Sequence, residues 1–312
     1  MAARGVPLSR PNPAVGAIIV RDGVVVGRGW TAPGGRPHAE AAALAQAGEA
    51  ARGATLYVTL EPCAHQSPRG PACADLVSAS GLSRVVIGCA DPDPRTAGKG
   101  ADRIRAAGAA VILAEHRASA ASLAGYLSVR ARTRPHVTLK LALSLDGCIA
   151  RSDGESQWIT GEAARAHCHA LRARSDAILV GGGTLRTDSP QLDVRLPGLS
   201  DRSPARWVLT RGKAPEGWQA LRCAADLSPL LPAQYLFVEG GAGAASAFLA
   251  ADTVDRLVLY RAPILIGGGR PALGDIGLSA LCAAHGRWQL SDRRSLGKDC
   301  LEVYERTACS QE

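Results

Sequence analysis

The first third of the chain alternates between short apolar runs and alanine-rich segments with recurring polar residues. Two β-branched runs, residues 14–20 and 23–30, meet at a turn signal around Asp22, which predicts a hairpin. The pattern further predicts helices over 38–53, 71–81 and 100–108, and strands over 54–60, 84–90 and 109–114. Strands that alternate with helices of this length favour an α/β layer with mostly parallel strands.

The hydrophobic pattern restarts near residue 133, which divides the chain into two domains. A helix is expected over 115–134, and Pro135 should end it after an arginine-rich stretch. We therefore place one domain at residues 1–133 and a second at residues 134–312. The second half again alternates, with a loop at 197–204 and an irregular stretch at 214–233. Its strands and strand-to-helix turns are expected at 136–147, 175–185, 205–210, 234–241 and 255–267.

Composition and charge limit the classes of protein to consider. The chain lacks an apolar run of about 18 residues and an apolar leader segment, so we expect no membrane contact and a cytoplasmic protein. Its net charge of +8 favours anionic partners, although codon usage explains the spread-out arginines equally well. Aromatic residues make up only 4%, which leaves few platforms for stacking nucleic-acid bases. Small phosphorylated molecules are therefore the better prediction. The nine cysteines are expected to be reduced thiols.

Four residues with complementary chemistry lie in one short window. His38 and Glu40 stand at the start of a predicted helix, Cys63 follows a proline at the end of a strand, and Cys73 lies ten positions later. One imidazole and two thiolates form the kind of three-ligand set that catalytic zinc sites use, with a fourth position for water. Zinc lowers the pKa of such a water, and a carboxylate beside it can move the proton. Each short pattern alone is common on surface helices, but their combination indicates a zinc-dependent hydrolytic site.

This order of residues resembles the zinc-dependent cytidine deaminase superfamily. Nucleic-acid deaminases of that group usually have two residues between the cysteines, whereas nine intervene here. The wider spacing is similar to the pyrimidine deaminase of riboflavin biosynthesis, and so are the stretches PNPAVGAIIV (11–20), TLEPCAH (59–65) and DPDPRTAGKG (91–100).

The deaminase resemblance implies roles for particular residues. It implies that His38, Cys63 and Cys73 bind one zinc ion and that Glu40 is the catalytic proton shuttle. Asn12 would contact the pyrimidine, and His65 would line the substrate pocket. Arg69 would correspond to an arginine in the family's loop between the two cysteines, shifted by one position in the sequence.

The second half has no metal signature but has two glycine-rich turns between a strand and a helix. They are LVGGGTL (179–185) and VEGGAGAAS (238–246). Backbone amides at such turns can approach a pyrophosphate, helped by the helix N-terminus. Neither turn has the Gly-x-Gly-x-x-Gly spacing of a dinucleotide-binding fold, and each alone is as well explained as a tight turn.

Together with LKLALSLDG (139–147) and GESQWITG (154–161), these turns resemble the riboflavin-pathway reductase, whose fold is similar to dihydrofolate reductase. The resemblance implies that NADPH is bound by Ala142, Trp158, Thr184, Asp188, Gly241, Ala242, Gly243, Ala244, Ala245, Ser246 and Ala247. It implies substrate contacts from Ser156, Arg172, Leu192, Arg195 and Glu239. Either Lys140 or Asp188 would assist protonation at the sugar.

The two resemblances together describe one bifunctional enzyme of riboflavin biosynthesis. They imply a cytidine-deaminase-like α/β/α layer domain followed by a dihydrofolate-reductase-like α/β domain, and a homodimer or higher homo-oligomer. The expected reactions are deamination of a diaminopyrimidine ribosyl phosphate and NADPH-dependent reduction of the ribosyl group to ribityl. Two alternatives remain open at this point, a nucleic-acid-editing zinc deaminase with an appended domain and a non-catalytic zinc-stabilised nucleotide-binding module.

Overall fold

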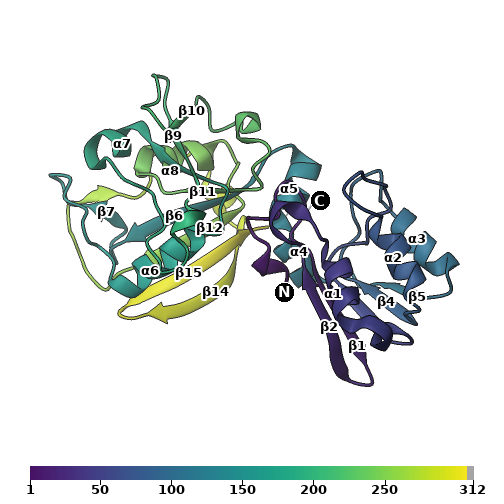
Figure 1. Cartoon of the computed structure of the whole chain (residues 1–312). Coiled ribbons are helices and arrows are strands. Elements are labelled where there is room, and N and C mark those ends of the chain that lie inside the picture. Colours follow the sequence, from purple (N-terminus) through teal and green to yellow (C-terminus); the bar gives the residue numbers. More distant parts are fainter. Residues whose placement is uncertain (308–312) are drawn as a thin grey trace. The chain divides into compact units, whose positions relative to one another are not determined.

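The structure is a computed structural model that describes residues 1–307. The chain divides into two compact units, Met1–Arg134 and Pro135–Glu312. Each unit consists of one main sheet with helices packed against it, as Figure 1 shows. Within residues 1–307, none of the helices is both long enough and apolar enough to cross a bilayer.

The first unit is built on a five-stranded sheet in the order β2-β1-β3-β4-β5. The strands β1 and β2 form the predicted antiparallel hairpin, and β1 is also antiparallel to β3. The remaining pairs, β3 with β4 and β4 with β5, are parallel. The bounds are β1 Gly16–Arg21, β2 Val24–Trp30, β3 Thr55–Val58, β4 Arg84–Ile87 and β5 Ala110–Leu113.

The helices of the first unit are shorter than the sequence pattern predicts. The helix expected over 38–53 ends at Ala47, because Gly48 turns to a positive φ of 52°, and a 3-10 turn over Gly48–Ala51 follows. The helix expected over 115–134 is two helices that meet at the buried Leu123. The bounds are α1 Ala39–Ala47, α2 Cys73–Ala79, α3 Lys99–Ala106, α4 Arg117–Ser122 and α5 Ala124–Arg132.

Helix α1 lies unusually close to the hairpin, and glycine makes this possible. A Cβ at Gly27 would lie 2.3 Å from the carbonyl oxygen of Ala43, and one at Gly29 would lie 2.1 Å from that of Ala39. Both glycines are in β2, so any larger residue there would push α1 away from the sheet. The close contact fixes the start of α1, where His38 and Glu40 lie.

The second unit is built on an eight-stranded sheet in the order β10-β9-β8-β11-β6-β12-β15-β14. The strands from β10 to β12 run parallel, and β15 and β14 add an antiparallel hairpin at one edge. The bounds of its strands are β6 His136–Leu143, β8 Ala177–Gly181, β9 Ala205–Leu209, β10 Gln219–Leu221, β11 Tyr235–Val238, β12 Arg256–Arg261, β14 Trp288–Leu296 and β15 Asp299–Arg306. A separate two-stranded ladder pairs β7 Cys148–Ala150 with β13 Arg270–Pro271.

Two hydrophobic clusters cover the two faces of this sheet. Val137, Leu139 and Leu141 of β6 join one cluster with Phe248 of α8, and Phe237 of β11 joins the other. The α/β fold expected for both halves is confirmed. Two details differ from the expectation: the stretch 214–233 contains the short strand β10, and the sequence pattern did not predict the β14–β15 hairpin. The helices are α6 Glu162–Arg172, α7 Gly182–Asp188 and α8 Ala242–Ala250.

Candidate functional site

The three residues predicted to bind metal lie together in the first unit. His38 directly precedes α1, Cys63 lies in the loop after β3, and Cys73 is the first residue of α2. One ligand atom from each lies within 4.8 Å of the others. Nδ1 of His38 is 3.2 Å from Sγ of Cys73 and 3.6 Å from Sγ of Cys63. One nitrogen and two sulfurs at this spacing fit a tetrahedral zinc ion that keeps one position for a non-protein ligand.

Glu40 lies beside this cluster, in the first turn of α1, and is 3% exposed. Burial raises the pKa of its carboxyl group to about 7, although the nearby His38 opposes the shift. A carboxyl group that exchanges its proton near neutral pH is suited to general acid–base catalysis. The pKa of Cys63 is lowered to about 4, chiefly by a hydrogen bond from Cys73, which favours the thiolate form of its sulfur.

The loop that follows β4, residues 88–98, is held by buried acidic residues. Glu61 is 4% exposed and accepts hydrogen bonds from the backbone N–H groups of Gly98 and Ala101, at 3.1 and 3.0 Å. Asp91 accepts one from the hydroxyl of Tyr126, at 2.8 Å. These bonds connect the loop and the start of α3 to Glu61, which follows β3, and to Tyr126 of α5.

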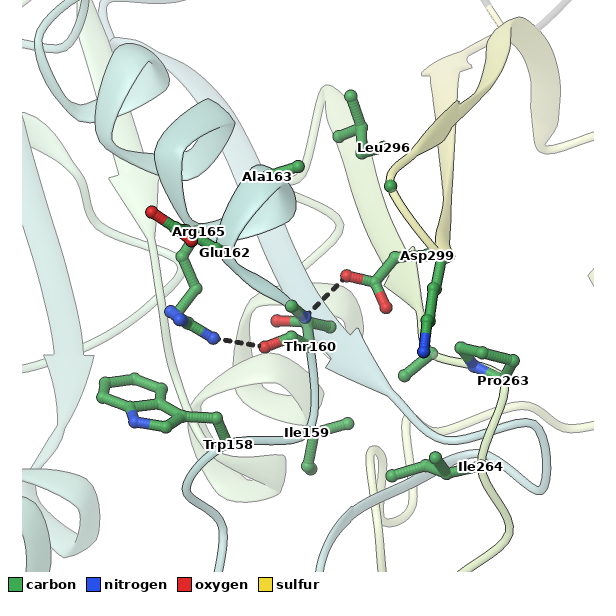
Figure 2. A pocket seen from close by; sticks show the side chains of 14 residues that line it. Trp158, Ile159, Thr160, Glu162, Ala163, Arg165, Pro263, Ile264, Leu296 and Asp299 are labelled. Carbon is green, nitrogen blue, oxygen red and sulfur yellow. Dashed lines mark hydrogen bonds between the residues drawn. The ribbon is translucent and has the colours of Figure 1, made fainter.

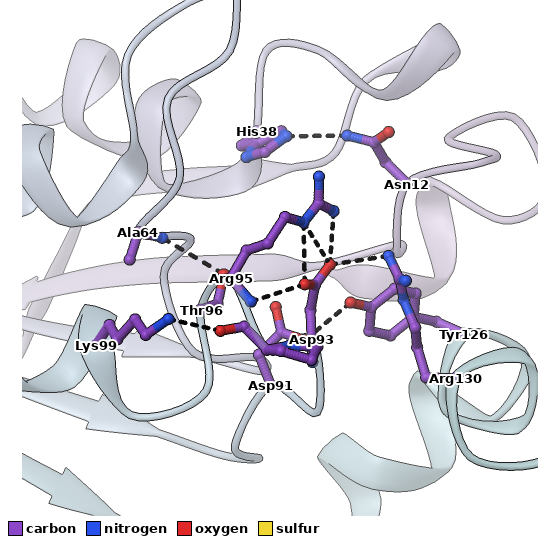
Figure 3. Close-up of polar contacts among 11 residues, drawn as sticks. Asn12, His38, Ala64, Asp91, Asp93, Arg95, Thr96, Lys99, Tyr126 and Arg130 are labelled. Carbon is purple, nitrogen blue, oxygen red and sulfur yellow. Dashed lines mark hydrogen bonds and ion pairs between the residues drawn. The ribbon is translucent and has the colours of Figure 1, made fainter.

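Asp93, in the same loop, pairs with two arginines, as Figure 3 shows. Its carboxylate is 2.6 Å from Arg95 and 2.9 Å from Arg130 of α5. The hydrogen bonds from Arg95 lower the pKa of Asp93 well below its usual range. The sequence analysis missed this network, because it depends on a tertiary contact with α5 that has no local sequence signal.

The other residues expected near the deaminase site contact the protein itself. Nδ2 of Asn12 lies 3.0 Å from Nε2 of His38, and it donates to the carbonyl of Gly35 at 3.2 Å. Arg69 donates to the carbonyl of Gly34 at 2.6 Å. Among the described residues, the buried Nδ1 of His65 has no hydrogen-bond partner.

In the second unit, two residues expected to bind substrate form a buried ion pair. Nε of Arg172, the last residue of α6, is 2.5 Å from Oε1 of Glu239, which follows β11. Their side chains are 11% and 9% exposed. Nζ of Lys140 is 3.7 Å from Oε2 of the same carboxylate. Burial acts to raise the pKa of Glu239, but Lys140 and Arg172 outweigh it and the pKa is lowered.

Residues that the sequence analysis missed surround this ion pair. Tyr260 is buried with Nζ of Lys140 5.9 Å from its ring centre, and its hydroxyl hydrogen-bonds His167 at 2.7 Å. Burial raises the pKa of the Cys168 thiol to about 12, so it stays protonated and can donate to Glu239. Cys168 and Tyr260 belong to a hydrophobic core cluster, and a core position gives no sequence signal of a role near an ion pair.

The segment after α7 lies against the end of α6. Arg172 donates to the carbonyl of Asp193 at 2.9 Å. Leu192 is buried and has a positive φ of 55°, and Arg195 is 3.4 Å from the carboxylate of Asp193. The structure thus brings Leu192 and Arg195 close to the Arg172 side of the ion pair.

The two glycine-rich turns lie side by side because β8 and β11 are neighbours in the sheet. Thr184 of α7 accepts a hydrogen bond from the backbone N–H of Gly241 at 3.2 Å. A Cβ at Gly240 would lie 2.5 Å from the Cβ of Ala244, so the turn requires glycine. The segment 241–247 covers the first turns of α8, and Asp188 is the exposed last residue of α7. Ala142 lies near the end of β6, the other neighbour of β11.

Trp158 lies in a pocket of about 620 Å³ in the second unit. The wall of this pocket comes from the start of α6, from residues 262–264 and from residues 296–299. Figure 2 shows Trp158 beneath Arg165, whose guanidinium carbon is 4.8 Å from the ring centre. Trp158 is 63% exposed, so the ring face opposite Arg165 can contact a planar ligand. Ser156 lies half-buried in the same loop, between β7 and α6.

Comparison with protein families gives a match for each half of the chain. Residues 1–89 match the cytidine and deoxycytidylate deaminase zinc-binding region. Residues 135–223 and 230–301 match the RibD C-terminal domain.

Individual relatives match along nearly the whole chain. The riboflavin biosynthesis protein RibD of Mycobacterium tuberculosis (strain H37Rv) is 40% identical over 93% of this chain and 90% of its own. RibD of Escherichia coli is 36% identical over 97% of this chain and 96% of its own.

Two solved structures are similar over the same extent. The structure of Acinetobacter baumannii RibD has a TM-score of 0.86, with 35% identity over 98% of this chain and 96% of that one. A diaminohydroxyphosphoribosylaminopyrimidine deaminase/5-amino-6-(5-phosphoribosylamino)uracil reductase from Thermotoga maritima has a TM-score of 0.87. It is 30% identical over 98% of this chain and 95% of that one.

Proposed function

Because the chain belongs to the RibD family of riboflavin biosynthesis proteins, we propose roles in its two reactions for the residues located above. The chain is a bifunctional deaminase and reductase that uses zinc in its first half and NADPH in its second. It acts on small molecules, and nothing indicates a nucleic-acid or membrane partner.

For the deaminase, we assign His38, Cys63 and Cys73 as the zinc ligands and Glu40 as the catalytic acid and base. Zinc, when bound, supplies a Lewis acid that makes water nucleophilic near neutral pH. Glu40 takes the proton of the attacking water and returns it to the amino nitrogen that leaves the pyrimidine as ammonia. Its burial excludes bulk water, so the proton is exchanged with the substrate.

For the reductase, the Arg172–Glu239 pair fixes the place of the sugar phosphate substrate. NADPH, when bound, supplies the hydride that reduces the ribosyl carbon to give the ribityl chain. Glu239 can accept hydrogen bonds from sugar hydroxyls, and Arg172 and Arg195 can donate to phosphate oxygens. Lys140, 3.7 Å from Glu239, is better placed than the exposed Asp188 to deliver a proton to the opened sugar.

We assign NADPH to the paired glycine-rich turns, with Thr184, Asp188 and residues 241–247 around its phosphates, and with Ala142 and Trp158 at its rings. The backbone N–H groups in the first turn of α8 suit a pyrophosphate.

The observation that carries this proposal is the meeting of one imidazole, two thiols and a buried carboxyl within one site. Removal of zinc by a chelator is expected to abolish ammonia release from the diaminopyrimidine phosphate. NADPH oxidation with supplied aminouracil phosphate should continue, because the second half has its own site. Added zinc should restore the first activity, and deamination that survives verified metal removal would refute the ligand assignment.

Replacement of Thr184 by valine is expected to raise the KM for NADPH by about three- to tenfold with little change in kcat. The change removes the acceptor for the Gly241 N–H, and one hydrogen bond contributes about 0.5–1.5 kcal/mol. Steady-state kinetics of NADPH oxidation measure the effect. Thr253→Val is the matched control, because Thr253 donates to the carbonyl of Phe248 at the other end of α8. Equal KM values in both variants would argue against the NADPH assignment.

We propose domain limits at residues 1–133 and 134–312, close to the division between the compact units. We propose a homodimer or higher homo-oligomer, which light scattering of the purified protein will test. A cytoplasmic location is proposed because the two thiol ligands must stay reduced to bind metal.

A further inference from the structure

The further inference concerns how the side chain of His38 is held, and it rests on the proposed ligand set. The imidazole of His38 lies between the two cysteine sulfurs and the side-chain amide of Asn12. Its Nδ1 faces the sulfurs of Cys73 and Cys63, at 3.2 and 3.6 Å. Its Nε2 faces the amide nitrogen of Asn12 at 3.0 Å, which is the contact drawn in Figure 3. The nitrogen that would bind zinc is therefore Nδ1, and Asn12 contacts the opposite side of the ring.

The backbone around Asn12 is itself fixed. The buried Ser9 donates from its hydroxyl to the carbonyl of Asn12 at 3.2 Å, and the N–H of Asn12 donates to the carbonyl of Ser9 at 3.0 Å. Gly35 packs against the Asn12 side chain, since a Cβ there would lie 2.6 Å from Cγ of Asn12. The amide can therefore rotate about its last bond, but it has little room to move away from His38.

The position of the imidazole proton of His38 decides whether Asn12 must donate to Nε2 or accept a hydrogen bond from it. A neutral imidazole carries its proton on one nitrogen only, and a metal-bound nitrogen carries none. When Nδ1 binds zinc, the proton is on Nε2, and Nε2 becomes a hydrogen-bond donor. An amide NH₂ at 3.0 Å from that N–H would place two donors against each other, although Nδ2 could still donate to the carbonyl of Gly35. Without a metal, the proton can stay on Nδ1 and point to a sulfur, and Nε2 then accepts from Nδ2 of Asn12.

We propose that Asn12 is a positioning residue of the zinc site and that its amide turns end for end when zinc binds. In the zinc-bound protein Oδ1 accepts the Nε2 proton of His38. The bond from Nδ2 to the carbonyl of Gly35 is then lost and Oδ1 lies beside that carbonyl, a cost that the new bond to His38 must exceed. Partners of this kind fix the ring and its tautomer, and their loss typically weakens metal binding by about 10–100-fold. This role differs from the pyrimidine contact expected for Asn12 from the sequence, because it acts on the metal through His38.

Zinc affinity of two Asn12 variants, measured by competition with a coloured chelator, tests the proposal. Asn12→Ala removes the acceptor and should weaken zinc binding by about 10–100-fold. Asn12→Asp keeps an acceptor but has no donor, so it should bind zinc at least as tightly as the natural chain. The opposite role, donation from Asn12 to His38, predicts that both variants lose affinity. Equal loss in both, or no loss in Asn12→Ala, would overturn the proposal.

Two controls separate this result from a failure of the fold or of the ligand set. Gln46→Ala removes an amide from α1 that accepts the N–H of Arg28 on the unit's surface, so zinc affinity should not change. Circular dichroism of each variant checks the fold. Cys73→Ser should lose zinc in the natural background, and its failure to do so would refute the ligand set itself. In zinc-loaded protein, ¹⁵N NMR of the imidazole should show the proton on Nε2 of His38, and a proton on Nδ1 would contradict the proposal directly.

Discussion

Replacement of Glu40 by glutamine is expected to slow deamination by a factor of about 10²–10⁴, the usual contribution of a positioned acid or base. Glutamine has the same size and can still form hydrogen bonds, but it cannot take a proton from water or give one to the departing amine. Zinc should remain bound, because the three proposed ligands are untouched. The rate is followed by ammonia release, and zinc content is measured on the same sample.

The control for this variant is Glu49→Gln, which changes the same residue type just beyond the same helix. Glu49 is 91% exposed and pairs with Arg52 on the surface, so its loss should leave both activities unchanged. The Glu40 variant should also continue to oxidise NADPH when the deaminated intermediate is supplied. If Glu40→Gln kept more than a tenth of the deaminase rate, Glu40 would not be the proton shuttle. Equal loss of both reactions would point instead to a damaged fold.

The metal site was accessible from sequence because its chemistry is concentrated in short motifs. His38 and Glu40 are two residues apart, and both are fixed by the start of one helix. Cys63 and Cys73 follow the end of a strand and begin a helix, two places where local patterns predict backbone direction well. The function, the family and the two cofactors expected from the deaminase and reductase resemblances are confirmed.

What could not be predicted depends on contacts between distant segments. Arg172 and Glu239 were both expected to bind substrate, but only the neighbouring positions of α6 and β11 show that they bind each other. The contacts of Asp91 and Asp93 with α5 likewise join distant segments. Helix ends were overestimated where alanine continues past a glycine, as at Gly48, because propensity does not register a positive φ. The β14–β15 hairpin was missed because charged residues interrupt its apolar positions.

Removal of Glu239 is expected to abolish the reductase and also to destabilise the second unit. In Glu239→Ala, Arg172 is left 11% exposed without its carboxylate partner, and Lys140 loses the same neighbour. Breaking a buried pair by removing one member typically costs about 3–5 kcal/mol of unfolding free energy. Four of the five tryptophans, Trp158, Trp207, Trp218 and Trp288, belong to the second unit, so tryptophan fluorescence during urea unfolding reports mainly on it.

A double variant separates the structural part of this effect from the catalytic part. Replacing both partners, Arg172→Met with Glu239→Met, removes the unpaired charge, so most of the lost stability should return. The reductase should nevertheless stay inactive, because the sugar phosphate has lost its two fixed contacts. Glu305→Ala is the matched surface control: its pair with Arg256 is about one third exposed, so we expect a cost of about 0–1 kcal/mol. A stable and inactive double variant would show that Glu239 serves the substrate as well as the fold. A double variant that regained activity along with stability would assign the pair to structure alone.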